Sequence, residues 1–280
     1  MRISLCNEVV RDLRFEEQCA LARALGYDGL EVAPFTLGHQ PHRLAAVRRR
    51  QLRRIAEDHG LVITGLHWLL LVPEGLSITG RDESVRLRTL DVMRRLIELC
   101  HDLGGGYLVH GSPKQRPVDP NEARETALGR AADAFAGVAG DAEAAGVAYL
   151  IEPLARTETQ IVNTVEEAVE IVRRIGSPAV RTMIDVSAAA NTEDAAVPAL
   201  VERWLPEGLI GHVHLNDPNR RAPGQGTLRF GPILDVLRRL DYGGWCGVEP
   251  FVYEPDGATS AARAIGYLRG LLEAEPPAAG

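Results

Sequence analysis

Eight short apolar segments recur along the 280-residue chain, and amphipathic segments separate them. The apolar segments are RISLCN (2–7), GLEVAP (29–34), ITGLHW (63–68), YLVHG (107–111), AYLIEP (148–153), RTMIDV (181–186), HVHLN (212–216) and WCGVEPF (245–251). They are rich in Val, Ile and Leu and are largely continuous rather than alternating. This pattern is typical of parallel strands that are buried on both faces. The sequence therefore predicts an α/β protein.

The amphipathic segments predict helices that connect these strands. We expect helices at 15–26, 85–104, 122–146, 164–176, 231–244 and 261–275. Eight strand–helix units without a domain linker predict one closed (β/α)8 barrel over residues 1–272. The end of the chain, 273–280, is predicted to be a disordered tail. A doubly wound open sheet is the structural alternative, but no GxGxxG follows the first strand.

Composition excludes several classes of partner. The net charge of −7 argues against a nucleic-acid partner, which needs a concentrated basic surface. The sequence contains no run of 18 apolar residues, so no membrane span is predicted. The first ten residues do not resemble a signal peptide. We therefore expect a cytoplasmic protein with neither a membrane nor a nucleic-acid partner. Lys114 is the only lysine among 31 basic residues, and we interpret it as a functional residue, with chance as the alternative.

Ionisable residues gather at the predicted strand ends. In a (β/α)8 barrel, the carboxyl ends of the strands surround the active site. These ends carry Glu31, His67, His110, Glu152, Asp185, His212, His214 and Glu249. The last four strands present an acid or a histidine at intervals of 33 residues (152 to 185), 29 residues (185 to 214) and 35 residues (214 to 249). One strand–helix unit takes about 30 residues, so these four positions are equivalent on consecutive strands.

The four equivalent positions predict a metal site. They are occupied by Glu152, Asp185, His214 and Glu249. Three carboxylates are strongly disfavoured in a dry site unless a cation neutralises them. An oxygen-rich set with one nitrogen suits Mn²⁺, with Mg²⁺, Co²⁺ and Zn²⁺ as alternatives. The competing interpretation is that each acid pairs separately with one of the many arginines.

The other strand-end residues are candidates for substrate contacts. His67 and His110 are expected to face the metal pocket and contact the substrate, with a structural role as the alternative. Trp68 is expected to form a wall on which a sugar stacks. Glu31 is either a substrate contact or the partner of an arginine. His212 points the same way as His214 and is expected to fill the barrel interior or to support the metal ligand.

The chain resembles the xylose-isomerase-like TIM-barrel superfamily, in particular its sugar isomerase and epimerase branch. That branch includes ketose 3-epimerases and hydroxypyruvate isomerases. The resemblance covers about residues 2–270 and rests on the order and spacing of GYDGLEV, GLHWLL, LVHGSPKQR, YLIEPL, MIDVS, GHVHLNDPNRRAPGQG and GWCGVEPF. It implies one catalytic divalent ion, typically Mn²⁺, held by Glu152, Asp185, His214 and Glu249. It also implies a homodimer or a homotetramer.

The resemblance further implies how a substrate is bound and converted. Glu152 and Glu249 would lie on opposite faces of a ketose, where one removes the proton next to the carbonyl and the other returns a proton. Glu158 and Arg220 would bind the substrate, and Asp217, in the same loop as Arg220, is expected to be a further substrate-binding residue. Lys114, in the loop GSPKQR, would contact the substrate or bind a carboxylate or phosphate on it.

One position departs from the ketose 3-epimerase pattern. Ala188 stands where those enzymes have a substrate-binding histidine. The candidates to replace that histidine are His67, His110 and Lys114. This departure affects the choice of reaction and substrate more than the metal site.

The sequence thus predicts a metal-dependent isomerase or epimerase acting on a ketose or a related sugar or cyclitol. The first alternative is a lyase with the same site, such as an inosose- or dehydroshikimate-type dehydratase or a C-glycoside-cleaving subunit. An endonuclease IV-like enzyme is a second alternative, which the acidic charge disfavours. A non-catalytic sugar-binding or partner-binding barrel is a third.

Overall fold

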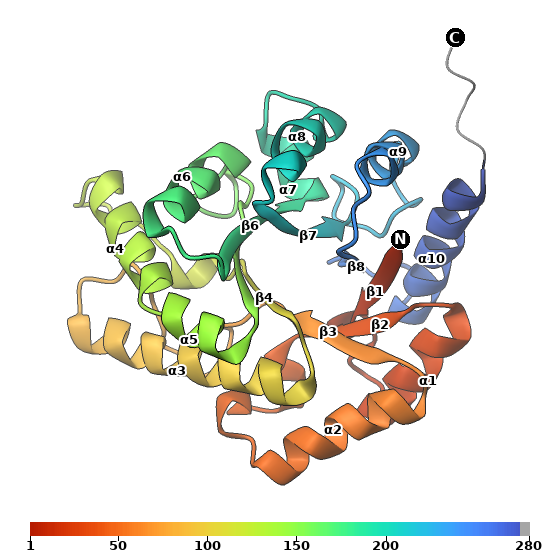
Figure 1. The fold of residues 1–280 in the computed structure, drawn as a ribbon, viewed down its shortest axis with the longest axis horizontal. Helices are drawn as coiled ribbons and strands as arrows, with labels where there is room; N and C mark the ends of the chain where they lie inside the picture. Colours follow the sequence, from red (N-terminus) through yellow and green to blue (C-terminus); the bar gives the residue numbers. More distant parts are fainter. Residues whose placement is uncertain (275–280) are drawn as a thin grey trace.

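Eight parallel strands close into a barrel in the computed structural model, which describes residues 1–274 (Figure 1). The strands are β1 (Arg2–Cys6), β2 (Gly29–Val32), β3 (Val62–Leu66), β4 (Tyr107–His110), β5 (Ala148–Ile151), β6 (Val180–Asp185), β7 (Ile210–Leu215) and β8 (Trp245–Val248). Each strand pairs with the next one in the chain, and β1 pairs with β8, with Arg2 opposite Trp245. The predicted (β/α)8 barrel is therefore confirmed.

Helices surround the barrel on the outside (Figure 1). They are α1 (Phe15–Leu25), α2 (Ala46–Asp58), α3 (Glu83–Leu103), α4 (Arg124–Ala136), α5 (Ala139–Ala145), α6 (Val165–Ile175), α7 (Val186–Thr192), α8 (Val197–Trp204), α9 (Gly231–Arg239) and α10 (Gly257–Glu273). Their apolar faces pack on the strands and complete the main core, while a smaller cluster forms separately from Tyr107, Val109, Leu150 and Met183. Within residues 1–274, none of the helices has both the length and the apolar character that crossing a bilayer requires.

The helices differ from the prediction in two ways: one expected helix is divided, and three helices, α2, α7 and α8, were not predicted. The single helix expected at 122–146 is divided into α4 and α5, because Gly137 and Val138 form a turn between them. Helix α2 was not predicted: its five arginines mask an apolar stripe of only Leu52, Ile55 and Ala56. The predicted tail at 273–280 lies outside the described residues except for Glu273, which ends α10, and Ala274.

Helix caps fix how the chain leaves the strands. Thr164 accepts a hydrogen bond from the backbone N–H of Glu167 at the start of α6, as the capping pattern predicts. Asp185, the last residue of β6, accepts from the backbone N–H of Ala188 at 2.6 Å. Because this cap starts α7 directly after β6, it also holds the Asp185 carboxylate at the mouth of the barrel.

Candidate active site

Four buried side chains converge at the carboxyl ends of the last four strands. Glu152 follows β5, Asp185 ends β6, His214 lies in β7, and Glu249 follows β8. One ligand atom from each lies within 4.8 Å of those of the other three. His214 Nδ1 is 3.0 Å from Glu249 Oε2, 3.4 Å from Glu152 Oε1 and 4.0 Å from Asp185 Oδ2. The structure thus brings together all four residues that the strand spacing predicted to be equivalent.

Asn216, immediately after β7, holds two of the carboxylate-bearing segments in place. Its Nδ2 donates to Asp185 Oδ2 at 2.7 Å and to the backbone carbonyl of Glu249 at 3.1 Å. Its Oδ1 accepts from the backbone N–H of Ser187 at 2.8 Å. A short amide side chain at the end of β7 therefore ties the ends of β6, β7 and β8 together.

A glycine after β4 makes room for Glu152. A Cβ atom at Gly111 would lie 1.9 Å from Glu152 Oε2. Only the absence of a side chain at this position lets the carboxylate occupy its observed place. The sequence contained this glycine in LVHGSPKQR, but nothing in the pattern indicated that it faces a carboxylate on the next strand.

Burial makes the charges of this cluster costly. Burial and the neighbouring Glu152 raise the pKa of Asp185 to about 7. Burial also raises the pKa of Glu249 to about 8, although His214 opposes this. Burial disfavours the charged His214 imidazole, but Glu249 and Glu31 hold its pKa well above the usual range. Burial therefore favours the protonated forms of Asp185 and Glu249 unless a further positive charge lies beside them.

The unpaired atoms of the cluster fit a divalent metal ion. Among the described residues, His214 Nδ1 and Glu249 Oε2 are fully buried and make no hydrogen bond of good geometry. Buried polar atoms rarely remain without partners in native proteins. Three carboxylates and one imidazole nitrogen, all facing one small space, form a donor set that binds a divalent ion. The residues that would hold such an ion are Glu152, Asp185, His214 and Glu249.

Glu31 lies beneath the cluster, inside the barrel. Its Oε1 is 2.9 Å from His214 Nε2, and its Oε2 accepts from the Tyr107 hydroxyl at 2.7 Å. Its Oε2 is also 3.0 Å from Nε2 of His212, whose ring stacks on Tyr107 with 4.4 Å between centroids. Neither of the two roles expected for Glu31, substrate contact or arginine partner, matches this position: Glu31 orients His214 from behind.

Three predicted substrate contacts lie behind the cavity wall rather than in it. His67 is fully buried, with Nε2 at 2.8 Å from Glu8 Oε2 and 3.8 Å from Glu249 Oε1. His110 is fully buried, and its Nδ1 is 2.7 Å from the Tyr149 hydroxyl. Asp217 is buried and accepts from the backbone N–H groups of Asn219 and Leu228. None of the three lines the cavity described next, and their role as substrate contacts stays a prediction.

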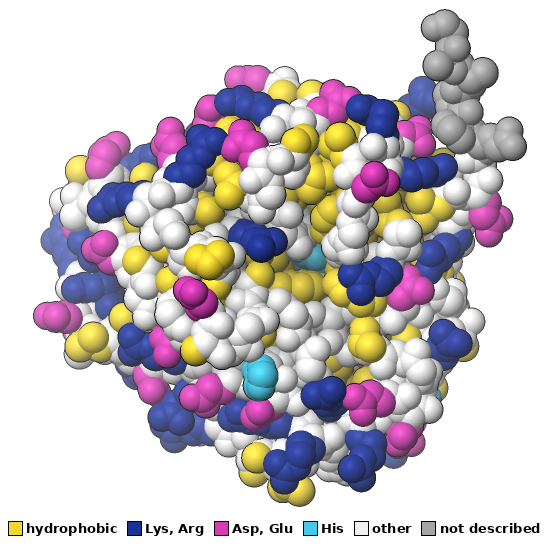
Figure 2. All heavy atoms as spheres, in the orientation of Figure 1, with side chains coloured by type: hydrophobic (Ala, Val, Ile, Leu, Met, Phe, Trp, Pro, Cys, Tyr) yellow, Lys and Arg dark blue, Asp and Glu magenta, His cyan; other side chains and the backbone are white. Residues whose placement is uncertain are grey.

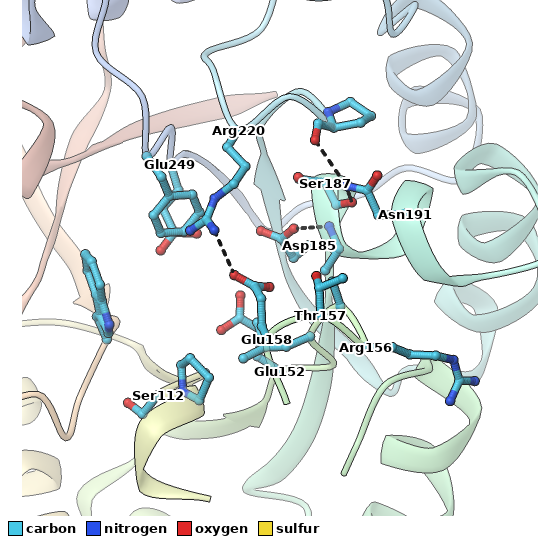
Figure 3. A pocket seen from close by; sticks show the side chains of 18 residues that line it. Ser112, Glu152, Arg156, Thr157, Glu158, Asp185, Ser187, Asn191, Arg220 and Glu249 are labelled. Atoms are coloured by element: carbon cyan, nitrogen blue, oxygen red, sulfur yellow. Dashed lines mark hydrogen bonds and ion pairs between the residues drawn. The ribbon is translucent and has the colours of Figure 1, made fainter. Parts of the chain in front are cut away.

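A cavity of about 350 Å³, here called the inner cavity, opens over the cluster (Figure 3). Its wall includes Trp68, Glu152, Glu158, Asp185, Arg220 and Glu249. Ala188 lies in the same wall. The position where ketose 3-epimerases have a substrate-binding histidine therefore faces the cavity in this protein with only a methyl group. Figure 2 shows one face of the molecule. Charged side chains lie mainly around the outer parts of that face, and apolar side chains gather nearer its middle.

Trp68 and Arg220 have strained backbones and define two sides of the inner cavity. The backbone φ is +52° at Trp68 and +67° at Arg220. Ser112, in the same wall, also has a positive φ, of +40°. Such conformations persist in non-glycine residues only where the surroundings fix them, and they cluster at functional sites. Three backbone hydrogen bonds fix Arg220, and its guanidinium lies 4.6 Å from the centre of the Phe251 ring.

Glu158 and Arg220 point toward each other in the wall of the inner cavity (Figure 3). Arg220 Nη1 is 3.5 Å from Glu158 Oε1, and the Arg220 side chain is 50% exposed. Both residues were predicted to lie at the site, and both line the cavity. Lys114 does not line the inner cavity, but it lines a second cavity next to it.

Comparisons with known proteins agree with this architecture. A family model described as xylose isomerase-like TIM barrel matches residues 19–271. A probable ketose 3-epimerase of Synechocystis sp. is 25% identical over 86% of this chain and 80% of its own length. A D-psicose 3-epimerase of Agrobacterium fabrum is 28% identical, over 81% and 76% of the two chains. A 3-dehydro-D-guloside 4-epimerase of Escherichia coli is 25% identical, over 96% and 99%.

A solved structure shows the same fold. The D-psicose 3-epimerase of Clostridium cellulolyticum H10, determined with D-tagatose, superposes with a TM-score of 0.83 at 21% identity. The superposition covers 98% of this chain and all of that one. Since the family model spans most of the barrel, the chain belongs to the xylose isomerase-like TIM barrel family.

Proposed function

We propose that this protein is a divalent-metal-dependent epimerase that acts on a keto sugar. The observation that carries the proposal is the position of Glu152 and Glu249, which both line the inner cavity and share one buried cluster with Asp185 and His214. The relatives support the reaction type, because those named above are epimerases of ketoses or of a keto glycoside.

The metal ion would be held by Glu152, Asp185, His214 and Glu249. Oxygen-rich ligation with one imidazole favours Mn²⁺, with Mg²⁺, Co²⁺ and Zn²⁺ as alternatives. When bound, such an ion polarises a carbonyl and stabilises negative charge on the oxygens of the substrate.

The two glutamates would exchange protons with one carbon atom of the substrate. One ionised carboxylate removes the proton from the carbon next to the carbonyl, and the C–H electron pair shifts to form an enediolate. The other glutamate, in its protonated form, then donates a proton to the same carbon from the opposite face. The new C–H bond restores the carbonyl and inverts the configuration. The configuration of the substrate decides which glutamate acts first.

The walls of the inner cavity would orient the sugar. Trp68 offers an aromatic face at one side, where its ring also packs edge-on against Phe251 at 5.8 Å. Glu158 and Arg220 offer an acceptor and donors for hydroxyl groups. Because Ala188 has no polar side chain, the carbonyl oxygen receives no hydrogen bond from a side chain at that position.

The proposal is tested by following carbon-bound proton exchange in D₂O by NMR. The Mn²⁺-loaded protein is given ketoses, keto glycosides, inososes and ketose phosphates, and each product is identified. We expect exchange together with an epimer for at least one keto sugar. If the substrate instead loses water or an aglycone, the protein is a lyase and not an epimerase.

Variants of the two glutamates test their roles. Glu152→Gln and Glu249→Gln should each lower turnover by about 10²–10⁴-fold, the usual contribution of a general acid or base. Glu143→Gln, on the exposed side of α5, serves as the matched control and should be fully active. Full activity in either Glu152→Gln or Glu249→Gln would refute the proposal.

A further inference from the structure

A second cavity of about 550 Å³, here called the outer cavity, adjoins the inner one. The two cavities share six residues of their walls, namely Trp68, Pro113, Arg156, Thr157, Glu158 and Arg220. The outer cavity is larger than the inner cavity that contains the carboxylate cluster. A single sugar ring placed over Glu152 and Glu249 therefore leaves this neighbouring space empty.

The boundary between the two cavities is a built feature. It contains the ion pair of Arg220 with Glu158 and the ring of Trp68. Arg220 and Trp68 both hold left-handed backbone conformations, which the chain maintains only because the surroundings fix them. A substrate that passes this boundary would touch both the pair and the ring.

The chemistry of the outer wall selects what fits there. The residues that line only the outer cavity include the apolar Leu71 and Pro117 and the neutral polar Gln115, Thr159 and Gln160. Mixed apolar and neutral polar walls are typical of pockets for small organic molecules. Such a wall suits an aglycone or a second sugar.

The charged residues of the outer wall are Lys114, Arg156, Glu158 and Arg220. Tight binding of a phosphate needs several convergent charged donors. Three cations line this wall: Arg220 pairs with Glu158, whereas Lys114 and Arg156 form no ion pair within residues 1–274. The negative charge of Glu158 itself would repel a phosphate.

We propose that the substrate is a glycoside of a keto sugar, with the sugar ring in the inner cavity and a neutral aglycone or second sugar in the outer one. This inference rests on the proposed function, because it places the reacting ring over Glu152 and Glu249. It goes further by naming a substituted substrate, which Leu71, Gln115 and Gln160 would recognise.

Gln160→Trp tests the inference by filling the outer cavity. Gln160 is exposed, and within residues 1–274 its only hydrogen bond is accepted by its backbone carbonyl from Arg124 Nε, so the change leaves the core intact. The probes are free D-fructose and 4-nitrophenyl 3-keto-β-D-glucoside, assayed by proton exchange with Mn²⁺-loaded protein. We expect the aryl glycoside to have a kcat/KM at least about tenfold above that of the free ketose. The variant should remove this advantage and leave the free ketose unchanged. Gln51→Trp, on the exposed face of α2, is the matched control.

A binding measurement separates the two proposals. Calorimetric titration with 4-nitrophenyl β-D-glucoside, which has no keto group, needs no turnover. Binding to the Mn²⁺-loaded protein that weakens about threefold or more in Gln160→Trp would support the outer cavity as an aglycone site, even if no probe is epimerised. Equal binding to both proteins would overturn the inference. So would a preference for fructose 6-phosphate that disappears in Lys114→Gln.

Discussion

His214 Nε2 lies 2.9 Å from Glu31 Oε1, and this contact turns His214 Nδ1 toward the carboxylates of Glu152, Asp185 and Glu249. Histidines that bind metals usually donate their other ring N–H to a carboxylate or carbonyl, which fixes the tautomer and the ring orientation. Glu31 is fully buried and also accepts from Tyr107. The barrel interior thus positions the imidazole before any ligand arrives.

Glu31→Gln should weaken Mn²⁺ binding. The amide no longer provides a charged acceptor for His214 Nε2–H, and loss of such a partner typically costs about 10–100-fold in metal affinity. The measurement is a calorimetric titration of metal-free protein with Mn²⁺. Tyr107→Phe, which removes only the hydroxyl bonded to Glu31, should have a smaller effect. An unchanged dissociation constant in Glu31→Gln would show that Glu31 does not support the metal site.

Gly111→Ala should disturb the site without unfolding the barrel. The added methyl group would overlap Glu152 Oε2 and force the carboxylate aside, and an overpacked position costs about 1–3 kcal/mol. We expect Mn²⁺ affinity to fall about tenfold or more. The control is Gly129→Ala in α4, where a Cβ meets no atom within 4 Å. That change should raise the free energy of unfolding by about 0.5–1 kcal/mol, as measured by urea denaturation. Normal Mn²⁺ affinity in Gly111→Ala would refute the prediction.

Arg220→Ala should raise KM more than it lowers kcat. The guanidinium faces the inner cavity opposite Glu158, and a hydrogen bond to a charged group contributes about 1.5–3 kcal/mol. The expected rise in KM is therefore about tenfold or more. Arg221→Ala is the matched control, because Arg221 pairs with Glu254 outside both cavity walls. A KM that does not change in Arg220→Ala would remove this residue from the substrate site.

Metal binding should release protons near neutral pH. In the metal-free protein the pKa of Asp185 is raised to about 7 and that of Glu249 to about 8, so both groups are partly or mostly protonated at pH 7. Metal ions bind the ionised carboxylates. Apparent Mn²⁺ affinity should therefore fall as the pH is lowered from 8 to 6. At pH 7, the calorimetric heat should vary with the ionisation enthalpy of the buffer, which indicates release of one or more protons. A heat that is the same in all buffers would contradict the prediction.

The strand pattern made the barrel and the cluster predictable. Continuous apolar segments identified all eight strands, because strands buried on both faces carry a strong signal. The intervals between Glu152, Asp185, His214 and Glu249 then placed them at equivalent strand ends. These four side chains do lie together. Their assignment as metal ligands stays a prediction that the titrations above test.

The depth of a side chain inside the barrel was not predictable. His67 and Glu31 also lie at or near strand ends, but they point toward the barrel axis below the cavity. Sequence position gives the strand and its face, whereas the depth depends on the stagger of neighbouring strands, including the register shift between β2 and β3. The loop residues that wall the cavities carry no periodic pattern, so Gly111 and Gln160 could not be recognised from sequence either.

The central claim is that catalysis needs one divalent ion held by Glu152, Asp185, His214 and Glu249. The most direct test is to strip the protein with a chelator, titrate it with Mn²⁺, and follow both bound metal and proton exchange of the best keto-sugar substrate in D₂O. We predict no exchange without metal, and exchange that rises in proportion to Mn²⁺ up to one ion per chain. Exchange at full rate in the stripped protein, or no binding of Mn²⁺, would contradict the claim.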